Sequence, residues 1–171
     1  MIRKFVQILK KYSMSHEEYG RFLGVKIGKG CSIKTRNFGM EPYLIEIGNN
    51  VQVTNGVSFY NHGGAWVLRD KYPDFDFFGK IKIGNNVYIG NYVLIMPGVT
   101  IGDNVIIGAG SIVTKSIPAD SVAVGVPARV VSSLTEYEKR VIPFNVNTKS
   151  MTNDEKRAFL LKLDDAYFVK K

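Results

Sequence analysis

A repeat of six residues dominates the middle of the chain. From Ile83 onward, six consecutive hexads read IGNNVY, IGNYVL, IMPGVT, IGDNVI, IGAGSI and VTKSIP. The first position of each hexad is branched and apolar, the fifth is small or branched, and the second is usually glycine. Each hexad therefore predicts a short β-strand followed by a tight corner, where glycine and asparagine accept backbone angles with φ > 0.

Three hexads are expected to close one triangular coil of 18 residues, and coils stack at the inter-strand spacing of about 4.8 Å. The first and fifth positions then point inward and fill a narrow core. Weaker hexads begin at Ile27, Ile47, Val53 and Phe59, and the period is interrupted at 35–44 and 63–80. The pattern predicts an all-β prism of about four coils with two excursions. A β-sandwich, with its irregular spacing of 8–12 residues, would not keep six hexads in phase.

Both ends of the chain are expected to be helical. Residues 1–12 place apolar side chains on one helical face, and capping-box sequences open further helices at Ser15 and Thr152. We therefore expect an N-terminal helical cap over 1–24, the prism over 25–132 and a C-terminal helical extension over 133–171. The helices would cover the open edges of the end coils. Alternatively, the basic N-terminal helix could touch a membrane surface.

Composition narrows the class of protein. The 171 residues suit one domain, and 45% hydrophobic with 22% charged residues is ordinary for a globular protein. There is no apolar run of the roughly 20 residues needed to span a bilayer, no signal-peptide core, and only one cysteine, Cys31. The cytoplasm is therefore the expected compartment. The net charge of +8 attracts polyanions, but no motif indicates nucleic acid as a partner.

The segment 83–131, which ends in GVPARVV, resembles the hexapeptide-repeat acyltransferases. The resemblance covers roughly residues 25–132 and is closest to the maltose/galactoside and surface-polysaccharide O-acetyltransferase branch. Its most specific part is the string IGAGS–TK–GVPARV. The resemblance implies a left-handed parallel β-helix, an exception to the usual right-handed crossover. It also implies a homotrimer, with acetyl-CoA in a groove between neighbouring prisms and no metal.

His62 is the candidate general base. An acceptor hydroxyl or amine must lose its proton as it attacks a thioester, and imidazole, with an unperturbed pKa near 6.5, is neutral and basic enough to take it. The resemblance implies the same role, because the catalytic histidine of the family lies just before a long loop. Alternatively, His62 merely caps a turn. Glu41 could orient the imidazole, but we favour the alternative that it does not, and His16 is expected to be a solvated surface residue.

The donor side of the expected site is marked by small residues and cations. Coenzyme A is a long polyanion, and the small side chains of IGAGS would let it approach the backbone. The resemblance places five residues on the coenzyme A groove: Asn91, Ala109, Thr114, Lys115 and Arg129. Lys115 and Arg129 would meet phosphates through charge-assisted hydrogen bonds. The alternative for each cation is an ordinary solvated surface charge.

Three residues are candidates for binding the acceptor. Asn37 precedes Phe38 in the first excursion and resembles an Asn-Phe pair that contacts the acceptor in the sugar acetyltransferase branch; the alternative is a turn asparagine. In the second excursion, the aromatic face of Trp66 and the charge of Arg69 would suit a saccharide. About half of the aromatic residues there are instead expected to pack against the prism or a neighbouring subunit.

The sequence therefore predicts an enzyme that moves acetyl from acetyl-CoA to a hydroxyl of a saccharide, which is a surface-polysaccharide precursor or a related sugar. N-acetylation of a nucleotide-linked amino sugar and acetylation of a xenobiotic would use the same base and donor. A β-helix scaffold without activity would have no reason for His62 beside a long loop. A zinc carbonic anhydrase on this fold needs three histidine ligands, and the chain has two histidines.

Overall fold

The computed structural model describes residues 13–170, which fall into two compact units that meet at residues 134 and 135. The helix expected over residues 1–12, with its possible membrane contact, lies outside the described residues. Among residues 13–170, no helix combines the length and apolar character that crossing a membrane requires.

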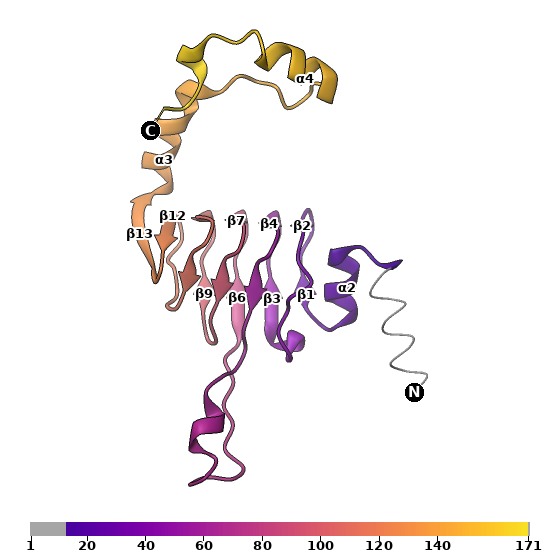
Figure 1. Cartoon of the computed structure of the whole chain (residues 1–171), viewed down its shortest axis with the longest axis vertical. Coiled ribbons are helices and arrows are strands. Elements are labelled where there is room, and N and C mark those ends of the chain that lie inside the picture. The colour runs from indigo at the N-terminus through magenta and orange to yellow at the C-terminus, as the bar shows by residue number, and fades with distance from the viewer. Residues whose placement is uncertain (1–12, 171) are drawn as a thin grey trace. The chain divides into compact units, whose positions relative to one another are not determined.

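The first unit is a prism built from three sheets (Figure 1). The first sheet holds β1 (Lys26–Ile27), β3 (Ile45–Ile47), β6 (Ile81–Ile83) and β9 (Thr100–Ile101). The second sheet holds β2 (Ser32–Ile33), β4 (Val51–Val53), β7 (Val87–Ile89), β10 (Val105–Ile107), β12 (Ser121–Gly125) and β13 (Ala128–Ser133). The third sheet holds β5 (Ser58–Phe59), β8 (Leu94–Ile95) and β11 (Ile112–Val113). The chain visits the sheets in turn, which confirms the parallel β-helix that the hexads predict.

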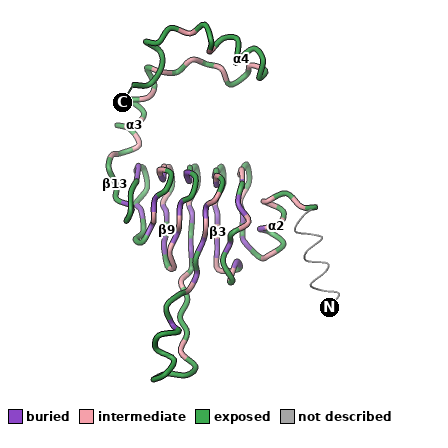
Figure 2. The backbone as a smooth tube through the Cα atoms, viewed as in Figure 1, coloured by how far each residue is buried: buried purple, intermediate pink, exposed green. Residues whose placement is uncertain are grey.

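Strand register confirms the coil length. In the coils built from the in-phase hexads, Val87 pairs with Val105 and Leu94 pairs with Ile112, so these strands pair in parallel with partners 18 residues apart. The antiparallel exception among the described strands is the hairpin of β12 and β13. Every first and fifth position of the six hexads from Ile83 is buried, as predicted. Figure 2 shows buried stretches along the strands, separated by exposed corners.

Asparagine side chains link the corners of successive coils. Asn50, Asn86, Asn104 and Asp120 all have φ between 53° and 57°, in the left-handed region that asparagine and aspartate tolerate better than most residues. Each of the three amides donates to the side-chain oxygen of the next residue in the column, at 2.9 Å. The Asn and Asp residues of the hexads therefore both turn the chain and connect the coils.

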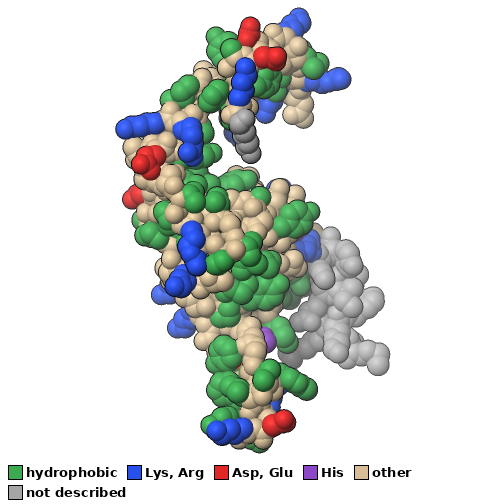
Figure 3. All heavy atoms as spheres, turned by 60° about the vertical axis from the view of Figure 1, so that its left-hand side comes forward, with side chains coloured by type: hydrophobic (Ala, Val, Ile, Leu, Met, Phe, Trp, Pro, Cys, Tyr) green, Lys and Arg blue, Asp and Glu red, His purple; other side chains and the backbone are tan. Residues whose placement is uncertain are grey.

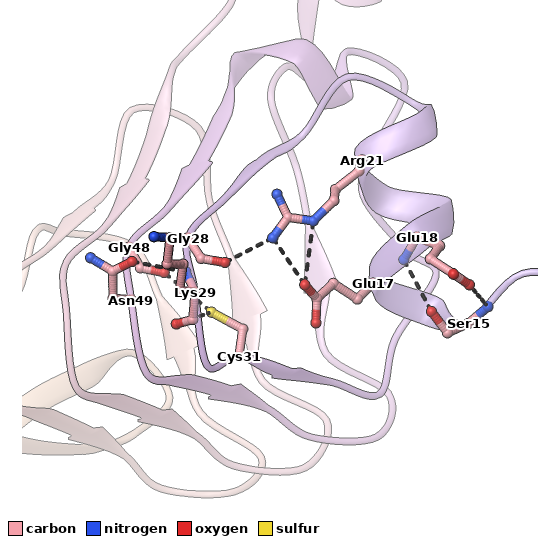
Figure 4. A network of polar contacts seen from close by, with 9 residues as sticks. All are labelled: Ser15, Glu17, Glu18, Arg21, Gly28, Lys29, Cys31, Gly48 and Asn49. Atoms are coloured by element: carbon pink, nitrogen blue, oxygen red, sulfur yellow. Dashed lines mark hydrogen bonds and ion pairs between the residues drawn. The ribbon is translucent and has the colours of Figure 1, made fainter.

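The helix α2 (His16–Phe22) packs on the first coil. Ser15 and Glu18 form both halves of the expected capping box, and Arg21 bridges Glu17 and the carbonyl oxygen of Gly28 at 2.9 and 2.8 Å (Figure 4). A Cβ atom on Gly20 would lie 2.9 Å from the ring of Phe38, so the absence of a side chain allows this close approach.

The second unit contains α3 (Leu134–Val141) and α4 (Asn153–Leu160), with short 3-10 turns at Ile142–Phe144 and Asp165–Tyr167. Thr152 and Glu155 form the capping box that the sequence predicts at the start of α4. Within this unit, local capping interactions therefore define where the helix begins.

Two excursions leave the prism, as the interruptions of the period predict. The first, between β2 and β3, includes a 3-10 turn at Pro42–Leu44. The second, the long loop of residues 63–80, includes a 3-10 turn at Ala65–Leu68 and extends away from the prism between β5 and β6 (Figure 1). Its base is closed by Asn61, which is buried and accepts a backbone hydrogen bond from Gly79 at 2.7 Å.

Candidate active site

His62 lies where β5 ends and the long loop begins, with 31% of its side chain exposed. It faces a cavity of about 450 Å³ between the base of the loop and the third sheet. The lining residues are Tyr60, His62, Gly63, Phe77, Leu94, Met96 and Pro97. Among these residues, only His62 is a base at neutral pH. The surrounding walls are apolar apart from the Tyr60 phenol, so the cavity places an imidazole beside an apolar surface.

Glu41 reaches the same imidazole from the first excursion. Its Oε2 atom lies 3.4 Å from Nε2 of His62, and its side chain is only 15% exposed. The imidazole also contacts an aromatic ring: the ring centroids of Phe78 and His62 lie 5.7 Å apart in a tilted arrangement. The sequence alone does not favour a contact between Glu41 and the imidazole. The residues that connect them pass through three strands, and no local pattern indicates that the two side chains meet.

Asn37 lies beside a second cavity, of about 400 Å³, that adjoins the first. Its Nδ2 atom donates to Oγ of Ser58 at 3.3 Å, and its carbonyl oxygen accepts from the amide of Phe59. Tyr60 lines both cavities, so Asn37 and His62 flank the same tyrosine. The structure thus brings the predicted acceptor residue and the predicted base to neighbouring pockets.

Trp66 and Arg69 lie further out along the long loop. The indole of Trp66 is 80% exposed, and the Arg69 guanidinium lies 5.9 Å from its ring centroid. Arg69 also lies 3.7 Å from the Asp76 carboxylate and donates to the carbonyl oxygen of Phe75. The described residues that line the His62 cavity do not include Trp66 or Arg69; Phe77 lines it instead. Figure 3 shows apolar side chains gathered along the loop and over the adjoining face of the prism.

Four of the predicted donor residues lie at the two corners that border the third sheet. Asn91 follows β7 and Ala109 follows β10, and the amide of Gly110 donates to the carbonyl oxygen of Asn91 at 2.8 Å. Thr114 and Lys115 follow β11 at the other corner. His62 follows β5 at the same corner of the prism, two coils earlier in the third sheet. At about 4.8 Å per coil, the separation along the prism axis is roughly 10 Å. All four donor residues are exposed.

Arg129 lies on β13 opposite Val124, and its Nη1 atom donates to the carbonyl oxygen of the neighbouring Ala128 at 2.8 Å. Val124 lies against Gly108, next to the corner that holds Ala109. The exposed Arg129 therefore comes from the hairpin that follows the last coil. Together with Lys115, it provides positive charge at the end of the prism away from α2.

The second histidine, His16, begins helix α2 and does not line the His62 cavity. Partial burial, followed by the positive charges of Arg36 and Lys34, lowers the pKa of His16 below its ordinary value. The two histidines are therefore separate in place and in surroundings, which makes His16 a suitable control in experiments on His62.

Comparison with known proteins gives a consistent result. The family model described as bacterial transferase hexapeptide (six repeats) matches residues 80–115. The chain is 44% identical over 165 residues to the protein CapG of Staphylococcus aureus, covering 94% of this chain and 95% of CapG. It is 47% identical over 102 residues to the galactoside O-acetyltransferase of Escherichia coli K12, covering 58% of this chain and about half, 49%, of that relative.

The fold is also similar to a solved structure of galactoside acetyltransferase in complex with coenzyme A. The sequence identity is 29%, 81% of this chain and 82% of that chain are covered, and the TM-score is 0.53. Solved members of this kind imply a left-handed β-helix for the parallel prism. With CapG matched over nearly its whole length and the hexapeptide model matched on the in-phase coils, the chain belongs to the hexapeptide-repeat acyltransferase superfamily, in its O-acetyltransferase branch.

Proposed function

We propose that this protein transfers an acetyl group from acetyl-CoA to a hydroxyl of a saccharide, with His62 as the general base. The observation that carries the proposal is the imidazole of His62 at an apolar cavity next to the pocket that Asn37 lines. Two similar proteins support the reaction class, since one is a galactoside O-acetyltransferase and the other is a galactoside acetyltransferase solved with coenzyme A.

In the proposed reaction, the acceptor oxygen attacks the carbonyl carbon of the thioester while its proton passes to the neutral imidazole of His62. The resulting tetrahedral adduct collapses as the carbon–sulfur bond breaks. The leaving thiolate then takes the proton from the imidazolium, so the products are an acetyl ester, the thiol of coenzyme A and neutral His62. The apolar walls formed by Phe77, Leu94 and Met96 would keep water from competing with the acceptor.

For the acceptor, we propose that the inner part of the saccharide binds in the Asn37 pocket, where an amide and the Tyr60 phenol offer hydrogen bonds. Trp66 and Arg69 are proposed to meet a more distant part of a longer saccharide. The support for this role is that the indole of Trp66 is exposed on the long loop with the Arg69 guanidinium close to its ring.

The first test is a panel of acceptors assayed with acetyl-CoA. We expect release of coenzyme A thiol to require a saccharide with a free hydroxyl, and the product to be an alkali-labile ester. Amino sugars linked to nucleotides and amine-bearing xenobiotics complete the panel. A product that is an alkali-stable amide, formed on amines alone, would contradict O-acetylation and favour the N-acetyltransferase alternative.

The second test concerns the donor groove, for which we propose Asn91, Ala109, Thr114, Lys115 and Arg129. Replacing Lys115 or Arg129 by alanine should raise the KM for acetyl-CoA by about 5–30-fold and change kcat less. Such a change corresponds to about 1–2 kcal/mol for one charge-assisted hydrogen bond on a partly wet surface. The matched control is Lys26→Ala, which should leave the KM for acetyl-CoA unchanged. Lys26 is also an exposed lysine, but it lies on the first sheet and pairs with Glu46. Normal coenzyme A binding by both variants would place the groove elsewhere.

We also propose a homotrimer of left-handed prisms of about four coils, capped by residues 1–24 and extended by residues 133–171, acting in the cytoplasm. The third sheet supports this assembly. Its outward-facing Leu94 and Ile112 are only partly buried within one chain, and proposed donor residues border both of its edges. A second prism packed against this face would cover the apolar side chains and complete a groove between subunits.

A further inference from the structure

We propose that Glu41 is a positioning residue for His62, which fixes the orientation of the imidazole and stabilises the imidazolium that forms during acetyl transfer. The inference rests on the proposed role of His62 as the base. It adds a residue from the first excursion to the machinery and assigns the carboxylate a task distinct from binding the donor or the acceptor.

The backbone holds Glu41 in place on the side of the cavity. Its carbonyl oxygen accepts a hydrogen bond from the amide of Leu44 at 2.9 Å, which closes the 3-10 turn, and the next residue, Pro42, is buried. The proline fixes its own φ angle and restricts the backbone of Glu41 before it. The carboxylate is therefore presented to His62 by a constrained turn rather than by a free side chain on the surface.

The carboxylate itself lacks another partner at its inner oxygen. Oε2 of Glu41 is buried and accepts no hydrogen bond from any described residue, while Nε2 of His62 lies 3.4 Å away. A buried carboxylate oxygen without a donor is energetically unfavourable, because it has lost its hydration without gaining a hydrogen bond. A small rotation of either side chain brings the imidazole N–H into hydrogen-bond distance, which removes this cost and leaves the other ring nitrogen for the acceptor proton.

The surroundings make this contact electrostatically important. Phe78 packs beside the imidazole, and the cavity wall is otherwise apolar except for the Tyr60 phenol, the one further titratable group among the residues lining it. Attraction between opposite charges is stronger in such surroundings than in water. When the imidazole takes the acceptor proton, Glu41 therefore stabilises a charge that is absent in the ground state, which favours the transition state selectively.

The experiment compares Glu41→Gln and Glu41→Ala with the wild type over a range of acetyl-CoA concentrations up to saturation. We expect kcat to fall roughly 10–100-fold, the range seen when the carboxylate partner of a metal-bound histidine is removed, while the KM for acetyl-CoA stays unchanged. Glu41→Asp should recover part of the rate. The control is Glu46→Gln, since Glu46 is an exposed carboxylate paired with Lys26 on the first sheet.

A Glu41→Gln enzyme with the wild-type kcat would overturn the role of Glu41 while leaving His62 as the base. Near-full activity of His62→Ala would instead overturn the proposed function itself. If neither Glu41 variant folds, NMR of the wild-type protein labelled with 15N-histidine decides. One tautomer with a slowly exchanging N–H at His62 supports the proposal, and two tautomers in rapid exchange contradict it; His16→Ala assigns the signals.

Discussion

Replacing His62 by alanine is expected to lower kcat by roughly 10²–10⁴-fold, the usual share of a general base. The chain has two histidines, and His62 is the one at the cavity. Its side chain is 31% exposed and occupies no core position, so its removal should leave the prism intact. Binding of acetyl-CoA should change little, because the proposed contacts of the donor lie at other residues.

The measurement is steady-state release of coenzyme A thiol, together with circular dichroism and calorimetric binding of coenzyme A. His16→Ala is the matched control and should keep the wild-type rate, since His16 lies at the start of α2. Near-full activity of the His62→Ala enzyme on its true acceptor would show that another group takes the proton.

Replacing Ile107 by alanine is expected to lower the free energy of unfolding by about 2–5 kcal/mol, the usual cost of truncating a buried isoleucine. Ile107 is 0% exposed on β10, between Ile89 on β7 and Ala123 on β12. The prism is narrow, and residues stacked directly above and below leave little freedom for neighbours to fill the cavity. Denaturant unfolding followed by circular dichroism measures the loss.

The neighbouring residue provides a control with the same side chain. Ile106 points outward from the same strand and is only partly buried, so Ile106→Ala should cost about 1 kcal/mol or less. Both variants remove the same atoms. The difference between their losses in free energy of unfolding therefore reports the inward orientation of Ile107 alone. Equal losses would contradict a solvent-facing position for Ile106 and indicate that another chain covers this face.

The sequence predicted the repeating part of the fold because the same local rule applies in every hexad. A branched residue such as Ile95 must point inward at each first position, and an asparagine such as Asn86 can adopt the left-handed corner that follows. Stacking then repeats the same contacts from coil to coil, so one hexad predicts its neighbours. The capping boxes at Ser15 and Thr152 were predictable for a similar reason, since their partners lie three residues away.

The sequence also determined which residue types are available for chemistry, and this inventory alone reduced the candidate imidazoles to His16 and His62. It could not determine what surrounds them. The contact between Glu41 and His62, and the choice of Phe77 rather than Trp66 as a cavity wall, depend on the paths of two excursions that have no repeat. Non-periodic loops pair residues through the whole chain path rather than through local spacing, and only the tertiary structure decides these contacts.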